Sequence, residues 1–162
     1  AYSNVKKNDL NHKITVRLGN GINKIDDDVD VVVISGLGGS LIKDIIVNDD
    51  RKNVKRFILQ PNNDAKCIRE ALPSIGFRIV DELVIKDNHK YYDIIVIERG
   101  NSNLTAFEEE FGPINLELKP HFYVERINKE LARLTKIAEN LKGSPNSIGV
   151  LAKIELLKEA LK

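Results

Sequence analysis

Two side-chain amides flank a proline at Gln60-Pro61-Asn62, directly after the apolar run 57–59. An amide can donate and accept a hydrogen bond at once, so this pair suits the edge of a nucleobase better than it suits acid–base chemistry. The proline stiffens the loop and keeps Gln60 out of the helical region. We therefore predict that Gln60 and Asn62 are the catalytic contacts to a base, with Pro61 beside it. The alternative is that Asn62 or Asp64 caps the helix that follows.

A glycine-rich turn, Gly36-Leu37-Gly38-Gly39, comes directly after Asp30–Ser35. Glycine lets the backbone approach a ligand or another chain closely, although a purely structural turn is the alternative. The turn is not the dinucleotide fingerprint, because it lacks the G-x-G-x-x-G spacing and no acidic residue closes the next strand at Gln60. A second turn, Gly19-Asn20-Gly21-Ile22, follows Ile14–Leu18, where branched and polar residues alternate and predict a strand. We expect both turns to lie at the same edge of one sheet and to share a ligand.

Aromatic and basic side chains are further candidates for contacts to a nucleic acid. Tyr91 and Tyr92 could stack on a base, although aromatic residues at the start of a strand more often pack. The basic cluster that runs from Arg51 to Arg56 indicates either solvated surface or a phosphate-binding footprint.

Other kinds of site are not supported by the sequence. His12, His89 and His121 are scattered without metal-ligand spacing, so we predict no metal site. The single cysteine, Cys67, occupies an apolar helical position and is expected to be a small buried hydrophobe. The chain has no P-loop, no G-x-S-x-G elbow and no Ser/His/Asp set that the spacing supports.

The elements that must position these residues alternate between strand and helix. The branched runs 30–34 and 57–59 predict strands buried on both faces of a parallel sheet, each followed by a helix, at Ser40–Val47 and Ala65–Leu72. Ligands of such sheets bind just beyond the carboxyl ends of the strands, which makes the two polar loops neighbours. An antiparallel hairpin, 77–86 with 91–98, completes the α/β fold.

From Pro120 onward the apolar residues recur every three or four positions, which predicts an antiparallel, coiled-coil-like helical hairpin. We therefore expect an α/β domain at 1–118 and the hairpin at 119–162. Residues 119–162 carry a net charge of +4 and residues 1–118 a net charge of −3. This excess predicts that hairpin cations, among them Lys129, Arg133 and Lys136, hold phosphates.

The 162 residues, 42% hydrophobic and 30% charged, are enough for one core with a small appendage. No apolar stretch approaches the roughly 20 residues needed to span a bilayer, so no membrane association is expected. The first residues lack the apolar core of a signal peptide, which predicts a cytoplasmic protein.

Five motifs, closed by the helical hairpin, carry a family resemblance that covers nearly the whole chain: Gly19-Asn20-Gly21-Ile22, residues 34–42, residues 57–62, residues 92–96 and Phe111-Gly112-Pro113. Together they resemble the bacterial tRNA (adenine-22-N1) methyltransferase family. The resemblance implies an S-adenosylmethionine-dependent enzyme that methylates N1 of an adenine in tRNA, with a Rossmann-like class I methyltransferase sheet and a hairpin that helps hold tRNA. It also implies that the cofactor is bound by Asn20, Gly21, Ile22, Gly36, Leu37, Gly38 and Gly39.

Two features depart from the family pattern. The family's first strand and its acidic cofactor loop precede the point where this chain begins. We therefore expect an N-terminal segment of roughly 55 to 70 residues to be missing. Without those strands, Ile14–Leu18 is expected to lie unpaired beside an open sheet edge. The chain as given is therefore expected to be inactive alone. The family usually has Asp where this chain has Asn20, which can still accept a hydrogen bond from adenine through its carbonyl.

Methyl transfer to adenine N1 needs no proton relay, because N1 has a free lone pair, so positioning is most of the work. The base must leave the tRNA stack and have its amino group held by an acceptor. The alternative to an enzyme is a non-catalytic α/β module that binds RNA or protein through its basic tail.

Overall fold

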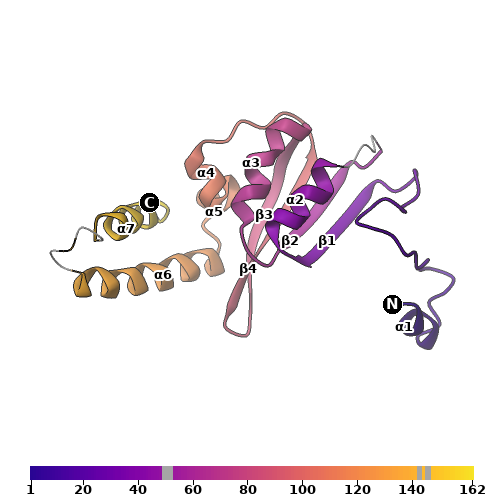
Figure 1. The fold of residues 1–162 in the computed structure, drawn as a ribbon, viewed down its shortest axis with the longest axis horizontal. Helices are drawn as coiled ribbons and strands as arrows, with labels where there is room; N and C mark the ends of the chain where they lie inside the picture. The colour runs from indigo at the N-terminus through magenta and orange to yellow at the C-terminus, as the bar shows by residue number, and fades with distance from the viewer. Residues whose placement is uncertain (49–52, 142–143, 145–146) are drawn as a thin grey trace.

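A four-stranded mixed sheet forms the centre of the molecule, and the computed structural model describes residues 1–48, 53–141, 144 and 147–162. The strands follow the order β1-β2-β4-β3, with β1 parallel to β2 and the other two pairings antiparallel. Their bounds are β1 Val31–Leu37, β2 Arg56–Pro61, β3 Phe77–Asp87 and β4 Lys90–Arg99. The predicted α/β class, with an antiparallel pair completing a parallel one, is confirmed (Figure 1).

Helices α2, Gly39–Val47, and α3, Ala65–Ile75, cover one face of this sheet (Figure 1). Burial alternates along β1, because Val32 and Ile34 are buried whereas Val31 is 46% and Val33 65% exposed. The prediction of a strand buried on both faces is therefore wrong for β1. Within the described residues the helices that follow β1 and β2 pack on the same side, so the other face of β1 is open.

The predicted strand at Ile14–Leu18 is also wrong, because these residues have no regular secondary structure and Leu18 is 98% exposed. A strand is stable only where a neighbour satisfies its backbone N–H and C=O groups. In the structure the segment has no strand partner and β1 lies at the edge of the sheet, which is the unpaired arrangement expected from the family's strand order. Helix α1, Tyr2–Lys7, precedes this segment.

The turn between β3 and β4 is the tight hairpin that the sequence predicts. Asn88 has a φ of +53°, a left-handed conformation that asparagine tolerates better than most residues. The register then pairs Asp87 with Lys90 and continues to Phe77 opposite Arg99, with one irregularity between Ile79 and Asp81.

Two short helices, α4 (Ala106–Phe111) and α5 (Pro113–Leu118), were not predicted. Thr105 and Glu108 form a reciprocal capping box at the start of α4, with the Glu108 amide donating to Thr105 Oγ1 at 3.2 Å. The T-x-x-E spacing was a sequence signal for this helix. Gly112, with a φ of +87°, turns the chain between the two helices.

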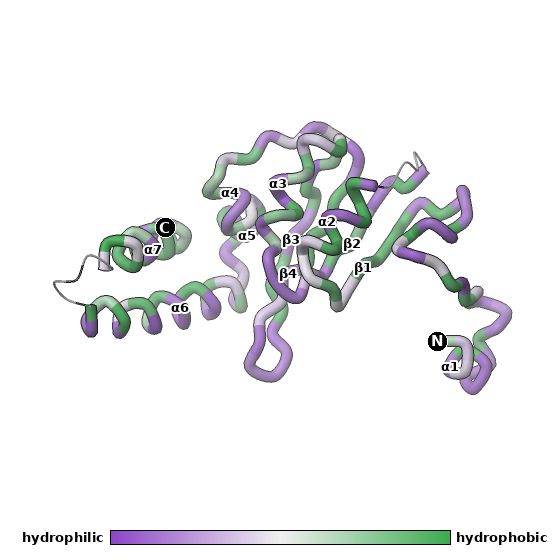
Figure 2. The backbone as a smooth tube through the Cα atoms, in the orientation of Figure 1, coloured by the Kyte–Doolittle hydropathy of each residue, from purple (hydrophilic) through white to green (hydrophobic). Residues whose placement is uncertain are grey.

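Helices α6, His121–Asn140, and α7, Ser147–Glu159, form the C-terminal hairpin; residues 142–143 and 145–146 of its connection lie outside the described residues. Figure 2 shows hydrophobic and hydrophilic residues alternating along α6 with the helical period. A second apolar core joins this hairpin to the sheet domain, and its buried members are Val84, Phe111, Tyr123, Ile127, Leu134, Ile154, Leu157 and Ala160. The hairpin therefore packs on β3 and α4, as two helices that bury little by themselves must.

Candidate active site

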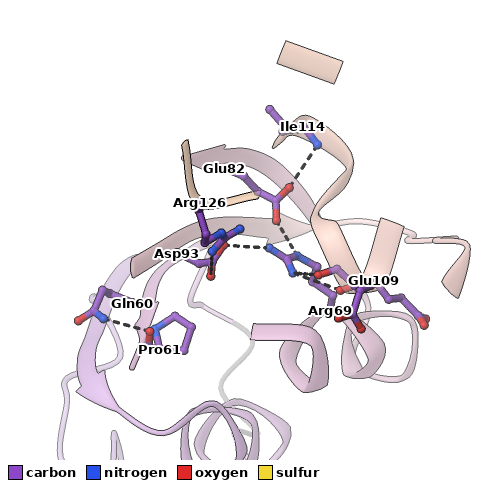
Figure 3. A network of polar contacts seen from close by, with 9 residues as sticks. Gln60, Pro61, Arg69, Glu82, Asp93, Glu109, Ile114 and Arg126 are labelled. Atoms are coloured by element: carbon purple, nitrogen blue, oxygen red, sulfur yellow. Dashed lines mark hydrogen bonds and ion pairs between the residues drawn. The ribbon is translucent and has the colours of Figure 1, made fainter. Parts of the chain in front are cut away.

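The two polar loops at the carboxyl ends of β1 and β2 interlock, as predicted. The Gly36 amide donates to Gln60 Oε1 at 3.0 Å, and Asn62 Nδ2 donates to the Gly36 carbonyl at 2.7 Å. Gln60 Nε2 donates to Asn62 Oδ1 at 3.3 Å and to the Pro61 carbonyl at 3.1 Å, the contact drawn in Figure 3. The amides thus brace the Gly36 turn and each other, and Asn62 Oδ1 accepts one hydrogen bond among the described residues, although a carbonyl oxygen can accept two.

The glycines of this turn have different roles. A Cβ at Gly39 would collide with the Asp64 backbone carbonyl, so this glycine allows the two loops to pack against each other. At Gly36, with a φ of +77°, a Cβ would meet nothing within 4 Å. This open position is compatible with the predicted close approach of a cofactor at Gly36, whereas Gly38 and Gly39 face the Asn63 loop.

The structure does not support the helix-capping alternative for these side chains. Asp64 occupies the N-cap position of α3 but makes no side-chain capping hydrogen bond, and it has a left-handed φ of +50°. Asn62 bonds to the β1 turn instead.

The two tyrosines lie on opposite faces of the sheet. Tyr91 packs against the second core, with Lys86 Nζ at 5.6 Å and Lys129 Nζ at 5.5 Å from its ring centroid. Its ring therefore already has two cationic neighbours. Tyr92 points to the other face of the sheet. Ile58 of β2 pairs with Val96 of β4, so these two side chains share a face. Because every second side chain of a strand lies on the same face, Gln60 and Tyr92 lie on that face too.

The predicted phosphate contacts are distributed over several elements. Arg133 is paired within α6, its Nη2 lying 2.7 Å from Glu130 Oε1, while Lys136 is exposed on the same helix. Arg56 lies on the open face of the sheet, where its Nε donates to Glu98 Oε1 at 2.8 Å. Arg51 lies outside the described residues.

The turn Gly19-Asn20-Gly21-Ile22 is not brought to the edge where the other loops meet. A Cβ at Gly21 would lie 3.4 Å from the side chain of Ile45, near the end of α2, whereas Gly38 caps the start of that helix. The expectation that both turns lie at one sheet edge is therefore wrong for this structure. The reason is that the expected strand before Gly19 is not formed, so nothing carries the turn to that edge.

A buried cluster of charges that no sequence motif predicted lies beside this edge (Figure 3). Arg69 Nε donates to Glu82 Oε1 at 2.7 Å, and Arg126 Nη1 donates to Asp93 Oδ2 at 2.7 Å. A longer ion pair of 3.6 Å, from Arg69 Nη2 to Asp93 Oδ1, joins the two halves. Both of those atoms are buried and without a hydrogen-bond partner.

The Arg69–Glu82 half of the cluster also holds the turn between α4 and α5. Arg69 Nη1 donates to the Glu109 carbonyl at 3.1 Å, and the Ile114 amide donates to Glu82 Oε2 at 3.2 Å. Burial raises the pKa of Glu82, although Arg69 opposes this effect. The only sequence signal for such a pair was an arginine and a glutamate at otherwise apolar positions.

A cavity of about 330 Å³ adjoins the cluster between the sheet domain and the hairpin. Its charged lining residues come from both parts, and they are Asp64, Lys66, Arg69, Asp93, Glu110, Arg126, Glu130 and Lys153. Within the described residues, no three His, Cys, Asp or Glu side chains are grouped so that they could hold a metal ion. None of the helices in this part of the chain is long and apolar enough to cross a membrane.

Comparison with known proteins assigns this arrangement to a family. Residues 1–161 match the family model described as tRNA (adenine(22)-N(1))-methyltransferase. The chain belongs to this family. The enzyme of that name from Bacillus subtilis (strain 168) is 30% identical, over 97% of this chain and 73% of its own length.

Solved structures of similar proteins agree with this membership. A putative tRNA (m1A22) methyltransferase from Streptococcus pneumoniae is 34% identical with a TM-score of 0.90, over 99% of this chain and 75% of that one. The same protein in complex with S-adenosyl-L-methionine gives a TM-score of 0.86 at 34% identity, over 99% and 74%. A Mycoplasma capricolum homologue bound to S-adenosyl-homocysteine gives 0.80 at 27% identity, over 98% and 73%. The family resemblance is confirmed, and it favours an enzyme over the non-catalytic module.

Proposed function

We propose that this protein uses S-adenosylmethionine to methylate N1 of an adenine in tRNA, at position 22 as in its relatives. The observation that best supports this location of the active site is the hydrogen-bonded pair of loops at the carboxyl ends of β1 and β2. Ligands of open α/β sheets bind at this edge. A cytoplasmic location is part of the proposal, because tRNA is the substrate.

When bound, the cofactor supplies a methyl group on a positively charged sulfur. The open backbone position at Gly36 is the part of the described chain that best fits a close-lying cofactor. We assign Leu37, which continues this turn, to the same contact region. Gly38 and Gly39, which face the Asn63 loop, shape the turn that holds this region in place.

The chain's own contribution to the reaction is to hold the base. Adenine N1 attacks the methyl carbon through its lone pair, and the carbon–sulfur bond breaks with its electron pair left on sulfur. Positive charge spreads onto the exocyclic amino group as the N1–carbon bond forms. An amide oxygen that accepts from this amino group stabilises the charge, and Asn62 Oδ1 is the acceptor that we propose. Gln60 fixes that oxygen by donating to it at 3.3 Å. Tyr92, on the face that it shares with Gln60, is the tyrosine we propose for stacking.

The test is Asn62→Ala in the natural protein, assayed with tRNA. Turnover should fall at least about tenfold, or about 1.4 kcal/mol in activation free energy, because the lost contact acts on the base as it gains charge. Affinity for S-adenosylmethionine, measured by calorimetry, should change by less than about twofold.

The matched control is Asn48→Ala, which removes an amide that donates to the Asp44 carbonyl at the end of α2, away from both loops. This variant should keep normal turnover. Wild-type turnover in Asn62→Ala would show that Asn62 only braces the Gly36 turn.

A further inference from the structure

Asp93 lies at the edge of the sheet where the two loops meet. Leu59 of β2 pairs with Ile95 of the antiparallel strand β4. Two residues further toward this edge, Asp93 of β4 therefore lies opposite Pro61 of β2. Its side chain is 17% exposed and points to the helix-covered face, toward Arg69 and Arg126 (Figure 3). It is therefore both next to the candidate active site and in contact with the hairpin.

One half of the charge cluster is fixed to the sheet domain. Arg69 and Glu82 bond to each other and to the backbone of Glu109 and Ile114, so neither can move without breaking the α4–α5 turn. Arg126 is the member that comes from α6, and its side chain is 25% exposed. Asp93 is the residue that connects this hairpin arginine to the fixed half.

The other contacts between hairpin and sheet are less directional. The apolar core around Val84, Phe111 and Tyr123 holds the hairpin on the sheet mainly through burial, which is less directional than a charged hydrogen bond. A second ion pair, Lys86 to Glu125 at 2.5 Å, also joins β3 to α6, but its side chains are 30% and 36% exposed and are more strongly screened. Of these two ion pairs, Arg126–Asp93, at 2.7 Å and with side chains 25% and 17% exposed, is the less exposed to solvent.

We propose that Asp93 is a positioning residue for tRNA: through Arg126, it sets the orientation of the α6–α7 hairpin relative to the Gln60–Asn62 loop. This inference rests on the proposed function, in which hairpin cations hold phosphates of the tRNA whose base reaches that loop. A small rotation of the hairpin moves those cations relative to the reacting base, and misplacement of a bound substrate lowers the rate steeply.

The experiment uses Asp93→Asn, Arg126→Gln and the double variant of the natural protein. Each single variant should lower kcat/KM for tRNA by about tenfold, and the double variant should be no worse than either, because both changes remove one contact. Affinity for S-adenosylmethionine should stay unchanged. Tm should fall modestly, because Asn keeps the shape of Asp but leaves the neighbouring arginine without its counter-charge. Arg126→Lys, which keeps the cation, should recover part of the loss.

The orientation itself is measured without any methylation assay. Spin labels at Asp44 of α2 and Glu139 of α6, in a Cys67→Ser background, report the distance between sheet domain and hairpin. The distance distribution should broaden or shift in Asp93→Asn. The matched control is Glu155→Gln, which breaks an ion pair of 2.7 Å that lies entirely within α7 and should change neither measurement.

Three results would overturn the proposal. Unchanged distances together with unchanged kcat/KM would show that the pair positions nothing. Additive losses, with a reduced salt dependence of tRNA binding in Arg126→Gln alone, would show that Arg126 contacts the RNA directly. Parallel losses of Tm and cofactor affinity would show a purely structural role. If the wild-type protein fails to methylate tRNA, the proposed function fails, while the distance measurement still tests the orientation.

Discussion

Glycine at position 112 is required by the buried charges beside it. A Cβ there would lie 2.5 Å from Glu82 Oε2 and 2.9 Å from Arg69 Nη2, and the φ of +87° is unfavourable for any residue with a side chain. The Phe111-Gly112-Pro113 motif, one of the five that carry the family resemblance, therefore has a structural cause. The turn that it forms brings α4 and α5 onto the Arg69–Glu82 pair.

Gly112→Ala should lower the free energy of unfolding by about 2 kcal/mol or more, because it adds backbone strain and displaces a buried ion pair. Urea denaturation measures this change. The control is Gly149→Ala in α7, where a Cβ would meet nothing within 4 Å and the φ is ordinary, so stability should rise by about 0.5 to 1 kcal/mol. Equal changes in the free energy of unfolding for Gly112→Ala and Gly149→Ala would show that the buried charges do not require glycine at position 112.

Tyr123 gives a prediction for alkaline pH. Its side chain is fully buried, its hydroxyl donates to the Ala160 carbonyl at 3.3 Å, and burial raises its pKa to about 12. Because the folded pKa lies above the unfolded one, the neutral phenol is favoured by folding. Its contribution is complete below pH 10 and is lost as the pH rises toward 12, by about 1.4 kcal/mol per pH unit.

Stability measured by urea denaturation between pH 9 and 12 should therefore fall more steeply in the wild type than in Tyr123→Phe. The phenolate absorbance of Tyr123, taken as the difference between the wild type and Tyr123→Phe, should also be largely absent from the folded protein at pH 11 and appear on unfolding. Ionisation of all four tyrosines near pH 10 in the folded state would refute this.

At the scale of elements, the hairpin both packs on the sheet domain and carries the chain's excess of positive charge. Its second core reaches into the sheet domain through Val84 and Phe111, so deleting residues 119–162 would expose apolar surface as well as remove cations. Substitutions on its outer surface separate the two effects. Several of its cations have acidic neighbours, but exposed pairs such as Arg133 with Glu130 are weak enough to be exchanged for phosphate contacts.

Reversing Lys129, Arg133 and Lys136 to glutamate should weaken tRNA binding and flatten its salt dependence by about 0.9 for each lost phosphate contact. Filter binding between low and moderate salt measures the slope. Reversing Lys6, Lys7 and Lys13, near the start of the chain, makes the same change of charge away from the hairpin and should leave the slope unchanged. An unaltered slope in the hairpin variant would move the RNA-binding surface elsewhere, with the cluster around Arg56 as the next candidate.

At the scale of the whole molecule, the candidate cofactor residues are divided between the two ends of α2. Gly21 lies beside Ile45, since a Cβ there would be 3.4 Å from that side chain, while Gly36, Gly38 and Gly39 lie at the other end, beside the Gln60–Asn62 loop. The division into domains at 1–118 and 119–162 stays a prediction. The second core, which residues from both ranges share, argues that the hairpin does not fold independently.

The 162-residue chain by itself should therefore bind S-adenosylmethionine poorly, because the residues predicted to hold it do not converge. Calorimetric titration at micromolar protein should give no binding heat. The homologous Streptococcus pneumoniae protein, whose complex with S-adenosyl-L-methionine is known, serves as the positive control. Micromolar binding by this chain would show that Gly19–Ile22 and Gly36–Gly39 come together in solution.

The sequence by itself determined the features that depend on neighbouring residues. The glycine turn after β1, the amide loop after β2, the tight turn at Asn88 and the helical hairpin all follow from local periodicity and turn chemistry, and the structure has each of them. Their meeting at one edge, Gly36 with Gln60 and Asn62, also followed, because parallel strands place their carboxyl ends together.

Only the tertiary structure decided which distant residues meet. Ile14–Leu18 has the alternation of a strand but none of the partner edge that a strand needs, and alternation alone cannot supply one. Asp93 and Arg126 are 33 positions apart, and Arg69 and Glu82 are 13 apart, so no local pattern pairs them. A buried charge is tolerated only where the fold provides its counter-charge, and that depends on how helices and strands pack rather than on the sequence around either residue.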